Sequence, residues 1–359
     1  MALAKTYNLP DLKKIAYIEI DTHAEIAQDF MNLMHDSQEF SVDYYFSEKI
    51  KNQIEENGNV VHISDPSMIL DQLSAKNYDL IIIGTVHRYF NTFLAICQKY
   101  NTSVIVHNLN FSKISKSDLI KNIFKNDLIY RLKLWWKEGL FYTKKTYEKA
   151  KNHLVLDEDL SSEKYKFLPL FYIRNFEKTT DEDLIIVIPG GVSQKRRDYN
   201  KVFTIIQNLK TKENFNFVFL GKAKGQELRE VEHLSENLPE NIKIVYFSER
   251  VSSDVFDEWM RKADVLWCPI QEKAEFFSSK EIYGKTKMTG NLGDAIKYGK
   301  PAVFPKKYSS KLEFIIPEEG NVIDQFLKLK DFKYDFQKDF SREKIQKNAE
   351  VLLNQLIST

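Results

Sequence analysis

Residues 184–199 read LIIVIPGGVSQKRRDY, and they contain the strongest indication of the fold. Five apolar residues in a row, 184–188, are typical of a strand that is buried on both faces of a parallel sheet. Gly190 and Gly191 follow, and glycine permits backbone conformations and a close ligand approach that other residues hinder. The stretch predicts a strand, a tight turn and then a helix.

Three cations follow the glycines, Lys195, Arg196 and Arg197, and we expect them within the first turn of that helix. Positive charge at a helix N-terminus is unfavourable with the helix dipole, so a bound anion would account for it. Arginine suits phosphate oxygens because its planar fork donates two parallel hydrogen bonds. The alternative is a plain strand-to-helix turn with a solvated basic start.

A second stretch, residues 281–301, reads EIYGKTKMTGNLGDAIKYGKP. It predicts a polar loop, then a helix that opens between Thr286 and Thr289 and ends at Gly299. Unpaired N–H groups and the dipole make a helix N-terminus an anion site, and Lys287 adds an ammonium there. A diphosphate is the ligand that this pattern favours. The alternative is an ordinary capped helix with a surface lysine.

The PGGVSQKRR loop and the YGKTKMTG…DAIKYGKP segment together resemble the donor-binding half of GT-B glycosyltransferases, in particular bacterial family 4-like enzymes. The resemblance covers residues 184–304, and the N-terminal half fits only by its pattern of strands and helices. The family usually has a pair of glutamates where this chain has Thr286 and Asp294. The resemblance implies diphosphate contacts at Gly190, Gly191, Arg196 and Lys287. It also implies that Glu281 and Asp294 are the acidic candidates for binding ribose or sugar hydroxyls. Arg197, Thr286 and Thr289 are further donor-site candidates, because of the run of cations and the expected helix N-terminus described above.

Length and composition agree with a two-domain α/β protein. A chain of 359 residues with 43% hydrophobic residues can bury two cores. Its net charge of +1 gives no indication of a nucleic-acid partner. Cys97 and Cys268 lie in apolar contexts, which suggests buried thiols and a cytoplasmic protein. We see no signal peptide and no metal-ligand spacing, and we expect no cofactor and no essential metal.

Strands and helices alternate along the chain, which predicts two Rossmann-like domains with parallel sheets facing a crevice. The predicted domains are 1–170 for the acceptor and 171–340 for the donor, with a C-terminal helix, 341–359, that crosses back to the first. The strands are predicted at 15–20, 42–46, 60–63, 79–84, 103–107, 153–156, 184–188, 215–220, 242–247, 264–268 and 301–304.

Polar residues at the ends of the N-terminal strands are candidates for acceptor chemistry, because ligands of such sheets bind at the carboxyl ends of the strands. Asp21, His23 and His87 are the catalytic candidates, since a base must take the proton of the attacking hydroxyl and histidine titrates near neutrality. His107 and Asn108 are candidates for acceptor binding. Each histidine is alternatively a hydrogen-bonded structural residue at a strand end.

The segment 121–151 carries nine Lys or Arg, three Asp or Glu, and several aromatic residues. Ile129, Leu132, Trp136 and Leu140 fall on one helical face with basic residues beside it. This pattern suits a helix that lies on an anionic membrane surface. It also suits a core helix with a solvated basic side, or a wall of the acceptor groove.

Together these features predict a cytoplasmic glycosyltransferase, peripheral at the inner membrane face if 121–151 binds lipid. It would transfer a sugar from a nucleotide-diphosphate donor to a glycan or lipid-linked glycan. The resemblance implies surface polysaccharide, lipopolysaccharide or glycoprotein glycan synthesis. The alternatives are a nucleotide-sugar 2-epimerase of the same fold and a non-catalytic sugar-nucleotide-binding subunit of a glycan assembly complex.

Overall fold

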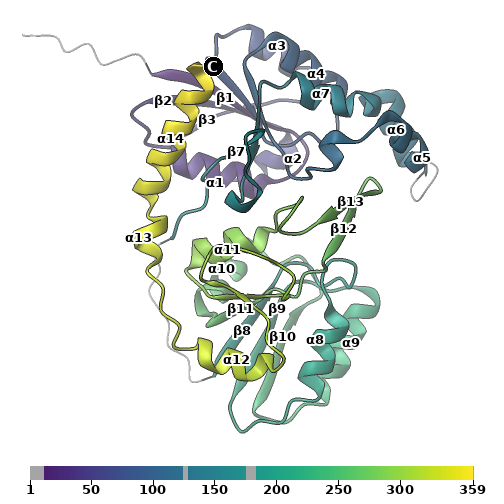
Figure 1. Ribbon diagram of the computed structural model, residues 1–359, viewed down its shortest axis with the longest axis vertical. Coiled ribbons are helices and arrows are strands. Elements are labelled where there is room, and N and C mark those ends of the chain that lie inside the picture. Colours follow the sequence, from purple (N-terminus) through teal and green to yellow (C-terminus); the bar gives the residue numbers. More distant parts are fainter. Residues whose placement is uncertain (1–11, 124–127, 175–182, 359) are drawn as a thin grey trace, which may run out of the picture. The chain divides into compact units, whose positions relative to one another are not determined.

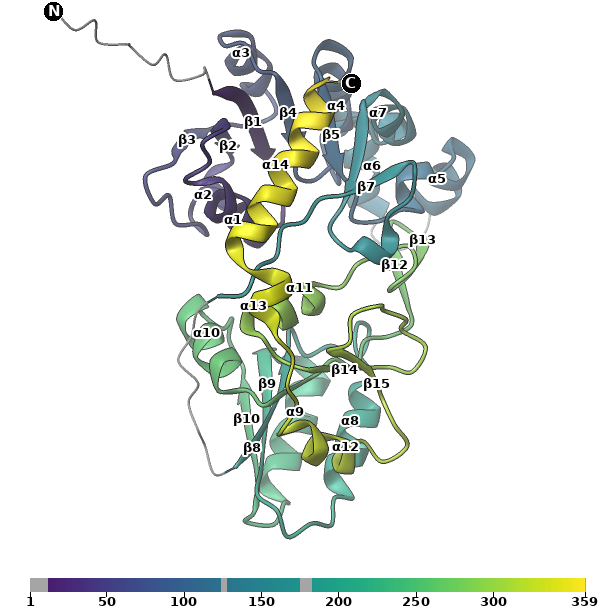
Figure 2. The same cartoon turned by 60° about the vertical axis from the view of Figure 1, so that its left-hand side comes forward.

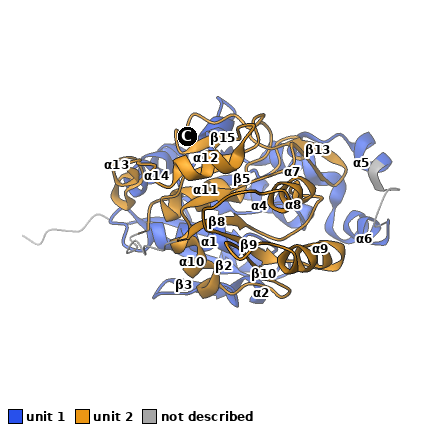
Figure 3. Cartoon of the chain, turned by 90° about the horizontal axis from the view of Figure 1, so that it is seen from below, with its two compact units in different colours: residues 1–107, 112–170, 345–359 blue, residues 108–111, 171–344 orange. Residues whose placement is uncertain are grey.

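A computed structural model describes residues 12–123, 128–174 and 183–358. The chain divides into two compact units, which Figure 3 shows in different colours. Unit 1 comprises residues 1–107, 112–170 and 345–359, and unit 2 comprises 108–111 and 171–344. One division between the units falls at 170/171. Four residues that follow a strand of unit 1, 108–111, are assigned to unit 2, which the sequence did not indicate.

Unit 1 is built on a seven-stranded parallel sheet in the order β3-β2-β1-β4-β5-β6-β7 (Figure 1). This is the strand order of a doubly wound, Rossmann-like domain. The strands are β1 Lys13–Glu19, β2 Phe40–Phe46, β3 Val60–Ile63, β4 Leu80–Ile83, β5 Thr102–Ile105, β6 Asn152–Val155 and β7 Tyr165–Phe167.

The helices of unit 1 connect these strands, and the last one joins it from the far end of the chain. They are α1 Ala24–Met34, α2 Glu48–Lys51, α3 Ile69–Ser74, α4 Phe90–Lys99, α5 Lys116–Ile123, α6 Leu128–Glu138, α7 Thr143–Lys149 and α14 Arg342–Ser358. Three short 3₁₀ turns occur at Phe111–Lys113, Leu140–Tyr142 and Glu158–Leu160.

Helix α14 contacts the edge of unit 1 where the strands begin (Figure 2). Ser37 donates a 2.6 Å hydrogen bond to Glu350, and Asn101 donates one of 3.1 Å to the carbonyl of Leu356. Because parallel strands run the same way, this edge is opposite to the carboxyl ends. These contacts of α14 therefore do not cover the carboxyl ends of the strands, where ligands of such sheets bind.

Unit 2 repeats the architecture with a six-stranded parallel sheet in the order β10-β9-β8-β11-β14-β15. A separate antiparallel hairpin, β12–β13, ends within the first two residues of the second motif. The strands are β8 Leu184–Pro189, β9 Phe215–Lys222, β10 Ile242–Phe247, β11 Val265–Trp267, β12 Lys273–Phe276, β13 Ser279–Ile282, β14 Ala302–Phe304 and β15 Ile315–Pro317. The helices are α8 Tyr199–Gln207, α9 Gly225–Glu236, α10 Ser253–Lys262, α11 Gly290–Tyr298, α12 Val322–Leu329 and α13 Phe336–Phe340.

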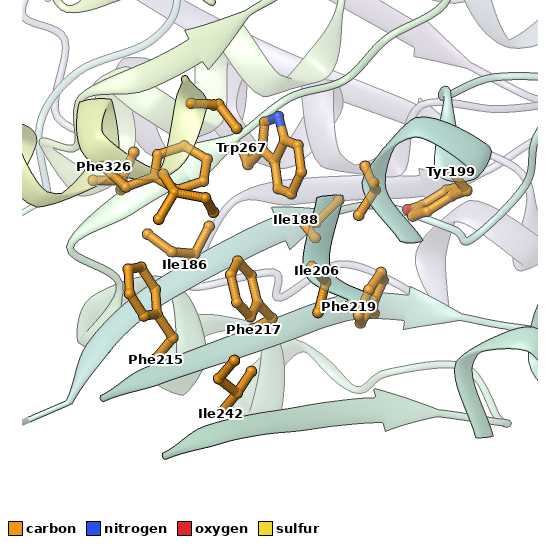
Figure 4. Packing of buried hydrophobic residues seen from close by; sticks show 14 of the residues in the cluster. Ile186, Ile188, Tyr199, Ile206, Phe215, Phe217, Phe219, Ile242, Trp267 and Phe326 are labelled. Atoms are coloured by element: carbon orange, nitrogen blue, oxygen red, sulfur yellow. The ribbon is translucent and has the colours of Figure 1, made fainter. Parts of the chain in front are cut away.

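The core of unit 2 forms around β8, whose six residues are all buried. Figure 4 shows its apolar side chains packed with aromatic rings from the neighbouring strands. The indole of Trp267 is 1% exposed and meets Phe326 edge-on, with 5.3 Å between ring centroids. The continuous apolar run in the sequence is thus explained by burial on both faces of a central strand.

Every strand predicted from the sequence is present, with ends shifted by at most two residues. The short edge strands β7 and β15 and the hairpin β12–β13 were not predicted. The sequence prediction was wrong about the cations after the first glycine turn. Helix α8 begins at Tyr199 with Asp198 as its N-cap, so Lys195, Arg196 and Arg197 precede the helix.

The glycine turn after β8 packs so closely against the end of strand β9 that Gly221 has no room for a side chain. A Cβ added there would lie 2.6 Å from the backbone nitrogen of Gly191 and would also meet the carbonyl group of Gly190. Backbone atoms cannot rotate away as a flexible side chain can. Glycine at this position therefore allows the turn after β8 to lie directly against β9.

We predict that Gly221→Ala lowers the free energy of unfolding by about 1–3 kcal/mol, the usual cost of overpacking. Gly320→Ala is the matched control, because a Cβ there meets nothing within 4 Å. Urea titrations of both variants measure the difference. Equal stability of the two variants would show that the loops separate freely.

Candidate functional site

The turn after β8 makes room for an arginine. Gly190 has φ +99°, a region that strongly favours glycine, and its N–H donates to the carbonyl of Leu220 at 2.9 Å. A Cβ at Gly190 would run into the guanidinium of Arg197. The glycine predicted as a ligand contact therefore also allows Arg197 to lie against the turn.

Arg197 is held by oxygens that carry no full charge. Its guanidinium donates to the carbonyl of Gly191 at 3.4 Å and to Oδ1 of Asn291 at 3.2 Å. Its Nε is buried and has no hydrogen-bond partner within the described chain. No carboxylate of the described residues forms an ion pair with it. Because a half-buried guanidinium normally has an anionic partner, its charge remains available to a ligand.

Asn291, which the sequence reasoning missed, connects this turn to α11. Its side chain is 3% exposed and donates to the carbonyl of Pro189 and to Asp294, each at 3.3 Å. Its Oδ1 accepts from Arg197 and from the hydroxyl of Thr289, the N-cap of α11. Both motifs of the sequence therefore meet at one buried amide. The only sequence signal was its place in the TGN at the start of the helix.

Lys287 lies in the loop before α11 and bonds to a residue predicted for the acceptor. Its Nζ donates to Oδ1 of Asn108 at 2.5 Å, and Asn108 is itself buried. Burial lowers the pKa of Lys287, the carboxylate of Glu281 partly offsets this, and the charge of Arg196 lowers it further. An anion beside this ammonium would stabilise its charged form.

Glu281 is fully buried in β13 and organises the same loop. Its carboxylate accepts hydrogen bonds from the backbone N–H of Phe111 at 2.9 Å and of Asn110 at 3.3 Å. Burial raises its pKa, and these bonds and that of Thr286 oppose the rise. This placement favours a positioning role over the direct hydroxyl contact that the resemblance implied.

The remaining donor-site candidates occupy different places. The side chain of Arg196 is exposed. Asp294 lies in the first turns of α11, and its carboxylate is 3.9 Å from the ammonium of Lys297. Thr286 accepts a 2.8 Å hydrogen bond from the backbone of Ile282, which ties it to the hairpin. The predicted donor-site residues thus form two groups. The first is arranged around Asn291 and consists of Gly190, Gly191, Arg197, Thr289 and Asp294. The second lies at the hairpin and consists of Lys287, Glu281 and Thr286, together with Asn108.

The charges of these residues in unit 2 are of the sign that an anion would require. Arg196 and Arg197 both act on the phenol of Tyr283, and Arg196 also acts on Lys287, so the three cations are neighbours. The nine-residue helix α11 begins beside them with Thr289 as cap. The N-terminal end of the α11 dipole is positive, as the cations are, so both favour an anion. Glu281 is the acidic group that acts on Lys287.

In unit 1 three histidines gather at the carboxyl ends of β1, β4 and β5. The rings of His23 and His107 stack with centroids 4.1 Å apart and an interplanar angle of 17°. His87 meets them edge-on at 6.0 Å and 5.8 Å respectively. The sequence had placed each at a strand end, and the fold brings all three together.

His23 has the geometry of an oriented base. It is the N-cap of α1 with φ 64°, a conformation rare for residues other than glycine. Its Nδ1 lies 3.0 Å from Oε1 of Glu25. A proton on Nδ1 satisfies that carboxylate and leaves Nε2 as the basic atom. Glu25 was not predicted from the sequence.

Asp21 is part of an ion-pair group. Its carboxylate lies 3.4 Å from Arg88, which also binds the buried carboxylate of Glu138 through two hydrogen bonds of 2.9 Å and 2.5 Å. Arg88 therefore joins Asp21, which follows β1, to Glu138 at the end of α6. The strand-end pattern predicted Asp21, but nothing in the sequence indicated its partner.

A buried carboxylate lies beneath the histidines. Glu19 is 0% exposed and accepts from the hydroxyl of Thr85 at 2.6 Å, and Thr85 lies 3.5 Å from Nε2 of His107. The same Nε2 lies 2.9 Å from the carbonyl of Gly84, to which it donates. Burial raises the pKa of Glu19 to about 7, although Thr85, His23 and two backbone N–H groups oppose the rise. A strand-end glutamate within an apolar run was the signal for this residue.

We predict that Glu19→Gln stabilises the fold above neutral pH. The folded pKa of Glu19, about 7, exceeds the unfolded value near ~4.3, so the folded state binds more protons between these values. The contribution of Glu19 to the free energy of unfolding is therefore complete below the unfolded pKa of ~4.3, and it is lost as the pH rises through the folded pKa of about 7.

The amide mimics the protonated acid, so its advantage should grow to about 3 kcal/mol at pH 8 and vanish near pH 4. Urea titrations between pH 4 and 8 measure it, with the exposed Glu55→Gln as control. An advantage that does not change with pH would contradict the raised pKa.

No family model matches the sequence, and no curated protein is significantly similar to it. Solved structures do match in fold. The chain is similar to HepE of Anabaena in complex with UDP, with 13% identity, 95% of this chain and 100% of that one covered, and a TM-score of 0.61. It is similar to an alpha-glucosyltransferase in complex with UDP, with 9% identity, coverage of 96% and 100%, and a TM-score of 0.58.

A third similar structure is the lipopolysaccharide outer core galactosyltransferase WaaB, with 12% identity, coverage of 95% and 99%, and a TM-score of 0.51. The chain has the GT-B fold. The predicted fold of two Rossmann-like domains is therefore confirmed. Within the described residues, no helix is long and apolar enough to span a bilayer, and no group of three or more His, Cys, Asp or Glu has the arrangement of a metal site.

Proposed function

We propose that this protein is a glycosyltransferase that uses a nucleoside-diphosphate sugar and a saccharide acceptor. The observation that carries the proposal is the set of cations at the start of α11, which has a half-buried guanidinium without an acidic partner in the described chain. The diphosphate of the donor matches this set in charge and in hydrogen-bonding geometry. Two similar structures are complexes with UDP, which is consistent with such a ligand.

In the proposed reaction, an acceptor hydroxyl attacks the anomeric carbon of the donor sugar. The bond between that carbon and the diphosphate oxygen breaks, and the nucleoside diphosphate leaves with the additional negative charge. Arg197, Lys287 and the N–H groups of α11 would stabilise this charge. Because protein cations supply that stabilisation, the proposal requires no divalent metal, and activity should persist in EDTA.

The acceptor proton needs a base, and His23 in unit 1 is the best candidate. Its bond to Glu25 presents Nε2 as the basic atom, and its side chain is 31% exposed. His87 is almost buried, and Nε2 of His107 bonds to a carbonyl, so both are better placed to orient the His23 ring. Asp21, with its charge held by Arg88, would stabilise the protonated imidazole.

The acceptor in this proposal is a glycan or lipid-linked glycan at the cytoplasmic side of the membrane, in surface polysaccharide, lipopolysaccharide or glycoprotein glycan synthesis. The test is a panel of UDP-, GDP- and dTDP-sugars, assayed with and without oligosaccharide acceptors. Release of nucleotide coupled to a new glycosidic bond supports the proposal. An epimerised donor without acceptor would show an epimerase instead, and nucleotide binding without turnover would show a non-catalytic subunit.

We predict that Arg197→Ala lowers donor turnover roughly 10- to 150-fold, the range for one charge-assisted contact to phosphate. Lys210→Ala is the control, because Lys210 is an exposed cation of unit 2 outside this set of cations. Lys287→Ala should resemble Arg197→Ala. Initial rates and nucleotide affinity by calorimetry measure all three. Wild-type rates and affinity in both Arg197→Ala and Lys287→Ala would show that the donor site lies elsewhere.

We predict that His23→Asn lowers sugar transfer by about 10²- to 10⁴-fold, as expected for loss of a general base, while nucleotide affinity stays near wild type. The exposed His35→Asn, also in unit 1, is the control. Transfer rates across pH and calorimetric titration with nucleotide separate the two effects. A parallel loss of nucleotide affinity would place His23 in donor binding or in folding.

A further inference from the structure

The helices α5 and α6 expose most of the large apolar side chains that are exposed in the described chain. Both views show the two helices side by side at one end of unit 1 (Figures 1 and 2). Trp136 is 91% exposed and Ile129 is 85% exposed. The α5–α6 surface is the name we give to the exposed side chains of Ile120, Leu128, Ile129, Leu132 and Trp136.

Helix α6 is oriented with an ionic side chain inward and its apolar side outward. Leu134 is fully buried, and Glu138 is 5% exposed because it bonds to Arg88 through two hydrogen bonds. At about 100° per residue, Ile129, Leu132 and Trp136 lie on the opposite side of the helix. A core helix would bury those residues, so the structure excludes the core alternative for this face.

The charge beside the apolar face is positive. Lys133 and Lys137 are exposed and follow Ile129 and Trp136 around one flank of α6. Of the nearby acids, Glu138 is paired with Arg88 and Glu148 with Lys144 at 3.7 Å, and the exposed Asp118 of α5 accepts a hydrogen bond from Ser115 at 2.6 Å. Lys116 and Lys121 of α5 add exposed ammonium groups. The surface therefore offers apolar contact and cations together.

We propose that the α5–α6 surface lies on an anionic lipid bilayer, with Trp136 and Ile129 in the headgroup and upper acyl region and the lysines at the phosphates. An exposed apolar face with a basic flank and tryptophan is the composition of an interfacial helix. A second copy of the chain fits less well, because two basic flanks would repel each other. This inference concerns attachment and does not depend on the proposed reaction.

The two neighbouring tryptophans differ, which gives the proposal a sharp test. Trp135 is 44% exposed and packs edge-on against Phe141 with centroids 5.3 Å apart, whereas Trp136 is 91% exposed. Only Trp136 should therefore enter the lipid. Brominated acyl chains should quench fluorescence in Trp135→Phe as in wild type. In Trp136→Phe most of the quenching should be lost although binding persists.

The binding experiment uses the full chain and vesicles of phosphatidylcholine with 30% phosphatidylglycerol. Ile129→Ser with Trp136→Ser should weaken co-sedimentation roughly tenfold or more at low salt, through lost apolar burial. Val60→Ser with Val351→Ser is the matched control, since these side chains are 52% and 51% exposed elsewhere in unit 1. Circular dichroism establishes that each variant is folded.

A second experiment tests the contribution of the positive charges by replacing Lys133 and Lys137 with glutamate. Loss of two lysines near an anionic surface should weaken binding about 25-fold or more, and added salt should reduce the difference. Lys210→Glu with Lys212→Glu is the control of equal charge change, on exposed positions in unit 2.

Three results would overturn the proposal. One is folded wild-type protein that does not bind anionic vesicles, and another is quenching that survives in Trp136→Phe. The third is self-association without lipid that Ile129→Ser with Trp136→Ser abolishes, because it would assign the surface to a second copy.

Discussion

The buried amide of Asn291 is the interaction on which the donor-side arrangement depends. It bonds at once to the carbonyl that ends β8, to the guanidinium of Arg197 and to the carboxylate of Asp294. These groups come from segments about a hundred residues apart, and each would otherwise be a polar group in a poorly hydrated place. With one side chain satisfying all three, the cation needs no acidic partner of its own. A charge held in this way is available to a diphosphate.

Glycine complements this bond by permitting close approach. The turn at Gly190 leaves space for the guanidinium of Arg197, and Gly221 lets strand β9 lie directly against that turn. Rigid backbone therefore surrounds the cation, which favours a preorganised anion site over a flexible one. In unit 1, hydrogen bonds and ring stacking, and not glycine turns, fix the positions of the candidate residues. Glu19 bonds to Thr85, and His23 stacks on His107 and bonds to Glu25, so these contacts orient the ring of His23, the base in the proposed reaction.

Helix α6 shows how a stable unit can present an apolar face to solvent. Its attachment comes from Leu134 and from the Arg88–Glu138 pair, which also reaches Asp21. Breaking that pair would leave a buried charge, so the orientation of the helix is strongly maintained. The proposed lipid surface and the proposed catalytic residues of unit 1 therefore share Arg88, and the ion pair contributes to both.

Sequence alone determined the strands of both sheets except β7 and β15, the two glycine-containing motifs and the Rossmann-like pattern, because apolar runs and glycine turns act locally and carry their own signal. It also indicated Arg197, Lys287 and the three histidines as candidates. It did not determine that Arg197 precedes its helix, that Asn291 and Glu25 orient the key groups, or that Glu281 is buried against the amides of 110 and 111. It left three alternatives for the apolar face of α6: a membrane surface, the protein core and a wall of the acceptor groove. Only tertiary structure decided these points, since each depends on hydrogen bonds or burial between segments distant in sequence, which no local pattern encodes.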